Sequence, residues 1–110
     1  TEKLLWAPGE GWRYSNMAFD VLGDVIAKVA GMSFEEYIQA NILEPVGMDR
    51  SSFIYFDIKE TLRTTGHVGK PPHISNVYPY NRRHAPSSTL NSSVSQMTKW
   101  ISRLRNLFIS

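Results

Sequence analysis

The stretch GEGWRYSNMAFDVLGDVIAKVAG, residues 9–31, decides the fold of this 110-residue chain. After Asn16, apolar residues recur every three or four positions, which is the pattern of one helix face; they are Phe19, Leu22, Ile26 and Val29. Asn16 is expected to cap the helix, because its side-chain oxygen can accept a free backbone N–H of the first turn. Gly31 is expected to end it. Gly23 is costly inside a helix and predicts a close neighbour.

Tyr14 and Asn16 stand two residues apart, just before this helix. Alternate side chains of an extended segment point the same way, so a phenol and a carboxamide should share one side. Such a pair could act chemically, but helix capping and core packing account for most tyrosines of this kind. The rest of the chain has to decide between the two interpretations.

Two further helices are predicted. The segment SFEEYIQANILEP, residues 33–45, begins with Ser33 and Glu36 at capping-box spacing, and Pro45 is expected to end its helix. A third helix should start near residues 92–93, with Ser93 and Gln96 at the same spacing and an apolar face running to Leu104. Met48 and Phe53 are expected to plug a core between the helices.

The composition of residues 54–91 predicts little regular secondary structure. The segment FIYF, residues 53–56, could form a short strand, but most of the chain from there to residue 91 is rich in Gly, Pro, Ser and Asn. So long an irregular stretch is uncommon in a compact domain and tends to be functional or disordered. Tyr78 and Tyr80 favour packing of part of it. The predicted fold class is therefore mostly α with long irregular loops, in one helix-rich segment over residues 1–110.

Composition excludes several classes of protein. The chain has no cysteine, which removes disulfides, thiol catalysis and cysteine-bound zinc. The formal net charge is only +2, so no nucleic-acid partner is expected. No apolar run approaches the roughly 20 residues that span a bilayer. The chain begins with Thr1 rather than Met and ends on apolar residues, so we expect an excised part of a larger domain.

Residues 8–53, PGEGWRYSNMAFDVLGDVIAKVAGMSFEEYIQANILEPVGMDRSSF, resemble the serine β-lactamase and penicillin-binding-protein-like family, most closely its class C-like branch. The family has a PG…YSN stretch before a helix ending in Gly, and a second helix closed by a tetrad like residues 45–48, PVGM. Residues 84–101, HAPSSTLNSSVSQMTKWI, resemble the family's later return toward the active site. The resemblance implies the helical middle portion of an α/β β-lactamase/transpeptidase-like fold.

The resemblance also implies a serine acyl-transfer site acting on a small-molecule amide, ester or peptide, without a cofactor. The family combines a nucleophilic Ser in S-x-x-K with a second motif of the Y-x-N kind and a third of the K-T-G type. By match to the second motif, Tyr14 is the catalytic proton-transfer residue and Asn16 the substrate-binding residue. Export to the periplasm or beyond is usual for the family.

The chain departs from the family pattern in two respects. No serine has a lysine three residues later, and no Lys-Thr-Gly occurs; RTTG at residues 63–66 is a superficial likeness. The chain therefore carries one catalytic motif of three, and we expect it to be inactive alone. Ser87 and Ser88 stand where the family often has a Gly pair, so the backbone there should differ.

Other functions remain open. His67, His73 and His84 lack the spacing of a metal site, so no metal is expected. The basic residues of NRRH, residues 81–84, are expected on a solvated face, although some could meet a substrate carboxylate. The alternatives to an enzyme are a non-catalytic helical binding or interaction module and a catalytically dead homologue. Apolar helix faces left exposed would favour self-association.

Overall fold

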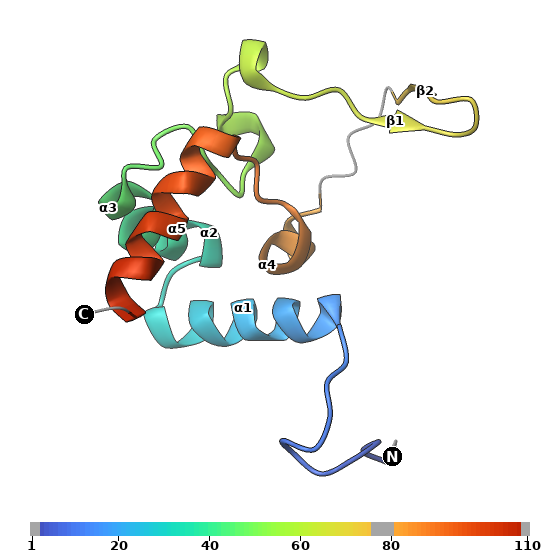
Figure 1. Ribbon diagram of the computed structural model, residues 1–110, viewed down its shortest axis with the longest axis vertical. Helices are drawn as coiled ribbons and strands as arrows, with labels where there is room; N and C mark the ends of the chain where they lie inside the picture. Colours follow the sequence, from blue (N-terminus) through green and yellow to red (C-terminus); the bar gives the residue numbers. More distant parts are fainter. Residues whose placement is uncertain (1–2, 76–80, 109–110) are drawn as a thin grey trace.

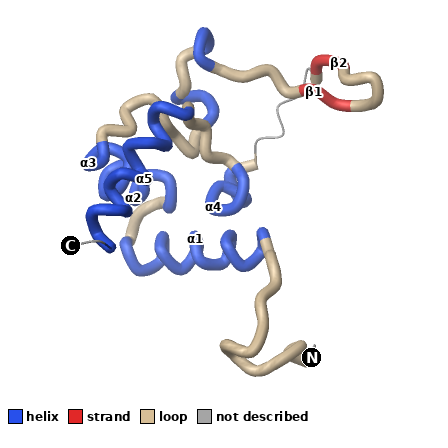
Figure 2. The backbone as a smooth tube through the Cα atoms, in the orientation of Figure 1, coloured by secondary structure: helices blue, strands red, loops and turns tan. Residues whose placement is uncertain are grey.

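The structure is a computed structural model that describes residues 3–75 and 81–108. It is mostly helical, with long loops between short elements (Figures 1 and 2). Helix α1 spans Asn16–Ala30 and α5 spans Val94–Phe108. Between them along the chain lie α2 (Phe34–Ile38), the π-helix η1 (Gln39–Leu43), α3 (Glu44–Val46), the 3-10 helices η2 (Tyr55–Asp57), η3 (Glu60–Leu62) and η4 (Arg82–His84), and α4 (Ala85–Ser88).

Helix α1 ends as predicted but begins differently. Gly31 adopts the left-handed conformation, with φ 68°, and its N–H bonds to the Ala27 carbonyl. The N-cap is Ser15 rather than Asn16, because Ser15 is extended and its Oγ accepts the Ala18 N–H at 3.2 Å. The prediction for Asn16 was wrong because its side-chain oxygen is taken by the Tyr14 hydroxyl.

The second helical stretch runs past the residue predicted to end it. The predicted capping box is confirmed, because Ser33 and Glu36 each accept the other's backbone N–H. Pro45, however, lies in the first turn of α3, directly after the π-helix, where its missing N–H costs little. Gly47, with φ 78°, is where the helical run stops.

The core lies between this helical stretch and α5. Leu43 and Met48 are fully buried, and Ile38 is buried beside them. Partly buried apolar side chains surround these three residues: Phe34, Tyr37, Ile42, Val46, Phe53, Met97 and Trp100. The predictions that Met48 and Phe53 plug a core are confirmed.

The start of α5 matches its predicted capping box only in part. Ser93 Oγ accepts the Gln96 N–H at 3.4 Å. The Gln96 side chain is not part of a box: it donates to Asp49 Oδ1 at 3.0 Å and accepts the Arg50 N–H. Buried polar groups need hydrogen-bond partners, and the buried Gln96 amide finds an acceptor in Asp49 and a donor in the Arg50 N–H instead of bonding to the start of its own helix.

Residues 54–75 and 81–91 form short elements separated by loops. The strand predicted at residues 53–56 does not form, because the chain bends into η2 there; the preceding residue, Ser52, makes an isolated antiparallel bridge with Asn91. A hairpin of β1 (His67–Val68) and β2 (His73–Ile74) projects from the helices (Figure 1), with His67 opposite Ile74. Tyr78 and Tyr80 lie outside the described residues.

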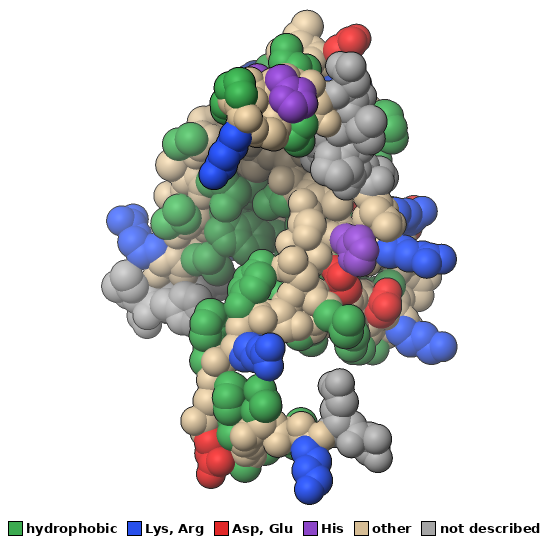
Figure 3. All heavy atoms as spheres, turned by 90° about the vertical axis from the view of Figure 1, so that its right-hand side faces the viewer, with side chains coloured by type: hydrophobic (Ala, Val, Ile, Leu, Met, Phe, Trp, Pro, Cys, Tyr) green, Lys and Arg blue, Asp and Glu red, His purple; other side chains and the backbone are tan. Residues whose placement is uncertain are grey.

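The N-terminal half of α1 packs on α4 (Figure 1). Gly23 makes this approach possible: a Cβ at this position would lie 2.0 Å from Pro86 Cγ. The predicted close neighbour is therefore Pro86. Much of the apolar face of α1 remains exposed, including Phe19, Leu22 and Val25, and hydrophobic side chains gather in a hollow of the face shown in Figure 3.

Candidate functional site

Tyr14 and Asn16 meet at the entrance to α1. The Tyr14 hydroxyl donates to Asn16 Oδ1 at 2.6 Å, as the alternation of an extended segment predicts. The Ser15 cap between them fixes where the extended backbone turns into helix. Both side chains are exposed, with Tyr14 at 63%. The tyrosine ring leans on Phe19, with ring centroids 6.5 Å apart.

This pair can exchange hydrogen bonds with a third group. The Tyr14 oxygen keeps lone pairs that can accept a hydrogen bond while its own O–H donates to Asn16. The Asn16 amide N–H₂ has no partner among the described residues, so it can donate to a carbonyl oxygen. The pair can therefore orient a polar substrate, but it offers no nucleophile of its own.

A carboxylate–imidazole pair lies one helical turn further along α1. Asp20 Oδ2 accepts from His84 Nδ1 at 2.8 Å when that nitrogen carries its proton. The His84 hydrogen bond is the main cause that lowers the pKa of Asp20; burial opposes it, and Ser87 adds to it. Ser87 nevertheless makes no well-formed bond to Asp20 Oδ1, which is buried without a hydrogen-bond partner in the described part of the chain.

A second ion pair holds the same segment in place. Arg82 Nε donates to Glu35 Oε1 at 2.8 Å, joining η4 to α2. The Glu35 side chain is only 6% exposed, whereas Arg82 is 65% exposed. Residues 82–88 are therefore attached to both α1 and α2, which places Ser87 and Ser88 beside α1. Those two hydroxyls lie 2.8 Å apart.

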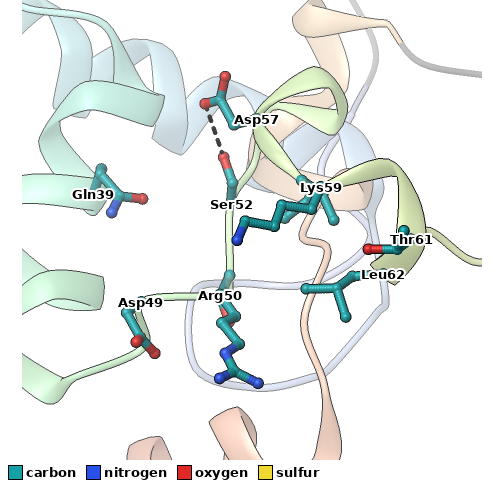
Figure 4. A pocket seen from close by; sticks show the side chains of 10 residues that line it. Gln39, Asp49, Arg50, Ser52, Asp57, Lys59, Thr61 and Leu62 are labelled. Carbon is teal, nitrogen blue, oxygen red and sulfur yellow. Dashed lines mark hydrogen bonds between the residues drawn. The ribbon is translucent and has the colours of Figure 1, made fainter.

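A polar cavity of about 830 Å³ lies elsewhere in the chain (Figure 4). Its lining comes from the start of η1, the turn after α3 and the η2–η3 segment, and includes no residue of α1. Figure 4 shows the Gln39 amide and the Lys59 ammonium pointing into it from opposite sides, and Ser52 donating to Asp57 at 3.3 Å. Asp49, which also lines the cavity, accepts a hydrogen bond from Gln96 Nε2, and this bond is the main cause that lowers the pKa of Asp49.

Neither a cluster of metal-ligating side chains nor a membrane-spanning helix is found in the described part of the chain. No group of three or more His, Asp or Glu side chains in residues 3–75 and 81–108 could hold a metal ion. In the same residues, every helix is too short or too polar to cross a lipid bilayer.

Comparison with known proteins defines the class. The family model described as Beta-lactamase matches residues 1–109, and the chain belongs to the β-lactamase family. The protein named flp of Staphylococcus aureus (strain NCTC 8325 / PS 47) is 31% identical over 102 residues, covering 91% of this chain and 20% of flp. Beta-lactamase-like protein 2 of Dictyostelium discoideum is 45% identical over 59 residues, covering 54% of this chain and 11% of that protein.

Two solved structures share the fold. The octameric penicillin-binding protein homologue from Pyrococcus abyssi superposes with a TM-score of 0.68 at 32% identity, over 88% of this chain and 22% of that one. The β-lactamase from Sulfitobacter sp. EE-36 superposes with a TM-score of 0.66 at 20% identity, over 89% and 27%. The chain therefore has the fold of a helical part of these proteins and spans about a fifth of flp and of the Pyrococcus homologue.

The sequence predicted Tyr14 and Asn16 as site residues and placed His84 only among the basic residues of NRRH, which were expected on a solvated face or, for some, near a substrate carboxylate. Asp20 and His84 are 64 positions apart, and no short motif joins them. One signal was available: Asp20 follows Asn16 by four residues, and residues spaced by four share a helix face.

Proposed function

We propose that the chain is part of a serine hydrolase of the penicillin-recognising type, that is, a β-lactamase, carboxypeptidase or esterase that acts through an acyl-enzyme. The observation that carries the proposal is the hydrogen-bonded, solvent-facing pair of Tyr14 and Asn16 in a chain of the β-lactamase family. Tyr14 transfers the proton of the nucleophile, and Asn16 binds the substrate carbonyl or amide.

The arrangement of Tyr14 and Asn16 supports these roles because each side chain can still form a hydrogen bond with a third group. An O–H donated to Asn16 holds the phenol oxygen in one direction, with its lone pairs available to a neighbouring hydroxyl. To transfer the nucleophile's proton, the phenol must pass on its own proton as it takes that one up, and a proton-transferring group in the correct place contributes about 10²–10⁴-fold to a rate. The nucleophile and the third motif do not occur among the 110 residues, so the isolated chain has no route to an acyl-enzyme.

The test is Tyr14→Phe in the full-length protein, assayed with a chromogenic ester and a chromogenic cephalosporin. We expect kcat/KM to fall at least about 100-fold through slower acylation, because only the proton-transferring oxygen is removed. The matched control is Tyr37→Phe, which removes a hydroxyl from a ring packed against the core. An unchanged kcat/KM for Tyr14→Phe would mean that Tyr14 only packs.

Self-association is a second part of the proposal. Val29 of α1 and Val94 of α5 are 84% and 83% exposed, and the Pyrococcus homologue with the same fold is an octamer. Exposed apolar side chains on a helix favour contact with another copy. Sedimentation of the full-length protein at several concentrations tests this, and a monomer at all of them would contradict it.

The alternative class is a non-catalytic binding module, and the polar cavity of Figure 4 favours it. Its charged and amide groups suit a small polar ligand rather than an apolar one. A catalytically dead homologue would look the same in this region. Full-length protein that forms no covalent adduct with any ester or β-lactam, but whose residues 49–62 shift in NMR spectra with small polar ligands, would favour the module.

A further inference from the structure

The polar cavity of Figure 4 is lined by two cations that no described side chain neutralises in direct contact. The Lys59 ammonium points into the cavity, and the Arg50 side chain also lines it. Within residues 3–75 and 81–108, neither side chain takes part in an ion pair or a side-chain hydrogen bond. The charge of Arg50 is only the smallest of the causes that lower the pKa of Asp49. Both cations can therefore bind an anion from solution.

The two carboxylates of the cavity are already engaged by other groups. Asp49 Oδ1 accepts a hydrogen bond from Gln96 Nε2 at 3.0 Å and lies 3.7 Å from Lys99 Nζ. Asp57 Oδ2 accepts a hydrogen bond from Ser52 Oγ at 3.3 Å. Both carboxylates keep their negative charge, so the cavity suits a ligand with one negative charge better than a ligand with two.

The wall opposite Lys59 supplies a hydrogen-bond acceptor from the π-helix η1. Gln39 begins η1, its backbone carbonyl accepts the Glu44 N–H, and its Nε2 donates to Glu44 Oε1 at 3.3 Å. Because Nε2 is turned to Glu44, the amide oxygen is the end that faces the cavity in Figure 4. π-helical turns are rare and occur frequently at functional sites. This turn places an acceptor across the cavity from a cation.

Hydroxyl groups dominate the rest of the lining, which continues into a second cavity of about 450 Å³. The two cavities share Arg50, Ile58 and Leu62, and Ser51 Oγ of the first lies 2.8 Å from Ser92 Oγ of the second. Three Ser or Thr side chains line the first cavity and four line the second, whereas no aromatic side chain of the described residues lines either. A ligand here meets groups that both donate and accept hydrogen bonds, and no ring on which to stack.

We propose that the two cavities form one binding site for a small open-chain polyhydroxy carboxylate. Lys59 and Arg50 hold the carboxylate, and Gln39 and the Ser and Thr side chains bond to the hydroxyl groups of the ligand. The volumes lie in the range of small-molecule sites. The site does not involve Tyr14 or Asn16, so the inference goes beyond the acyl-transfer function and does not depend on it.

The experiment measures binding to the full-length protein by isothermal titration calorimetry, with gluconate as the probe. We expect a dissociation constant of about 1 mM or below, from the usual affinity per atom of a ligand of this size. Sorbitol has the hydroxyl groups without the carboxylate, and acetate has the carboxylate without the hydroxyl groups. Each of these two should bind at least about tenfold more weakly than gluconate. Inorganic phosphate should also bind more weakly, because the two aspartates repel a second negative charge.

Two variants test where gluconate binds. Lys59→Gln and Arg50→Gln should each weaken its binding about tenfold or more, because each removes a charged donor to the carboxylate. The matched control is Lys28→Gln, which removes an exposed lysine in the last turn of α1 that lines neither cavity. Its affinity for gluconate should be unchanged.

Each of four results would overturn the inference: no binding of gluconate at millimolar concentration, sorbitol binding as tightly as gluconate, acetate or phosphate binding as tightly as gluconate, or an unchanged affinity in Lys59→Gln or in Arg50→Gln. Because the two variants are separate surface substitutions, either one decides the placement if the other does not fold. Failure to form an acyl-enzyme would contradict the proposed hydrolase but would not change these measurements.

Discussion

A methyl group added at Gly23 should drive α1 and α4 apart. The Cβ of Gly23→Ala would lie 2.0 Å from Pro86 Cγ and 2.7 Å from Pro86 Cβ, whereas carbon atoms pack at about 3.5–4.0 Å. The proline ring is rigid, so it cannot turn aside as a flexible side chain would. The contact must open by more than an ångström, at the interface that also carries the Asp20–His84 pair.

The size of the effect depends on two opposing terms. Overpacking costs about 1–3 kcal/mol, and an overlap this large belongs at the upper end. Replacing glycine by alanine inside a helix returns about 1 kcal/mol. We therefore expect Gly23→Ala to lower the free energy of unfolding of the full-length protein by about 2 kcal/mol.

Urea unfolding followed by tryptophan fluorescence measures this change. Pro86→Ala removes Cγ, the atom in closest contact, and supplies the control. In the double variant, the cost of Gly23→Ala should shrink by about 1 kcal/mol, because residues in contact are energetically coupled. A Gly23→Ala protein that is more stable than the unaltered one by about 1 kcal/mol would show that helix propensity acts unopposed. The close approach of Pro86 would then be wrong.

Two further predictions concern the N-terminal cap of α2 and the Arg82–Glu35 ion pair that joins η4 to α2. Ser33→Ala should lower the free energy of unfolding by about 1 kcal/mol through loss of the α2 cap, with Ser33→Thr as the conservative control. The hydrogen bond from Ser33 is the main cause that lowers the pKa of Glu36, so the ionised Glu36 side chain stabilises the fold above the ordinary carboxyl pKa, and this contribution is lost as pH falls through the lowered pKa. Ser33→Ala should therefore flatten the acid dependence of the melting temperature. An unchanged pH profile of the melting temperature would count against this role of Ser33. Arg82→Ala should cost about 1–3 kcal/mol in chemical unfolding because it leaves the buried Glu35 carboxylate unpaired, whereas Arg83→Ala should change it by less than about 0.5 kcal/mol; equal effects of the two would refute the pairing.

The helices could be predicted from the sequence because their signals are local. Apolar periodicity, the left-handed glycine at Gly31 and the Ser33–Glu36 box each act within a few residues, and each is found where it was expected. The family could likewise be recognised, since the Tyr-Ser-Asn triplet and its flanks are contiguous in the chain. The meeting of Tyr14 and Asn16 is a consequence of the alternation of an extended backbone.

The remaining features depend on contacts between distant segments, which no local pattern encodes. Ser15 rather than Asn16 caps α1, because the Tyr14 hydroxyl donates to the side-chain oxygen of Asn16. Gln96 forms no capping box, because its buried amide bonds to Asp49 in another segment. Asp20 and His84 met only because Gly23 lets α4 approach α1. The sequence by itself determined where the three main helical stretches lie and which family the chain belongs to. Only the tertiary structure decided which polar groups satisfy one another, because a hydrogen-bond donor takes whichever acceptor the packing brings within reach.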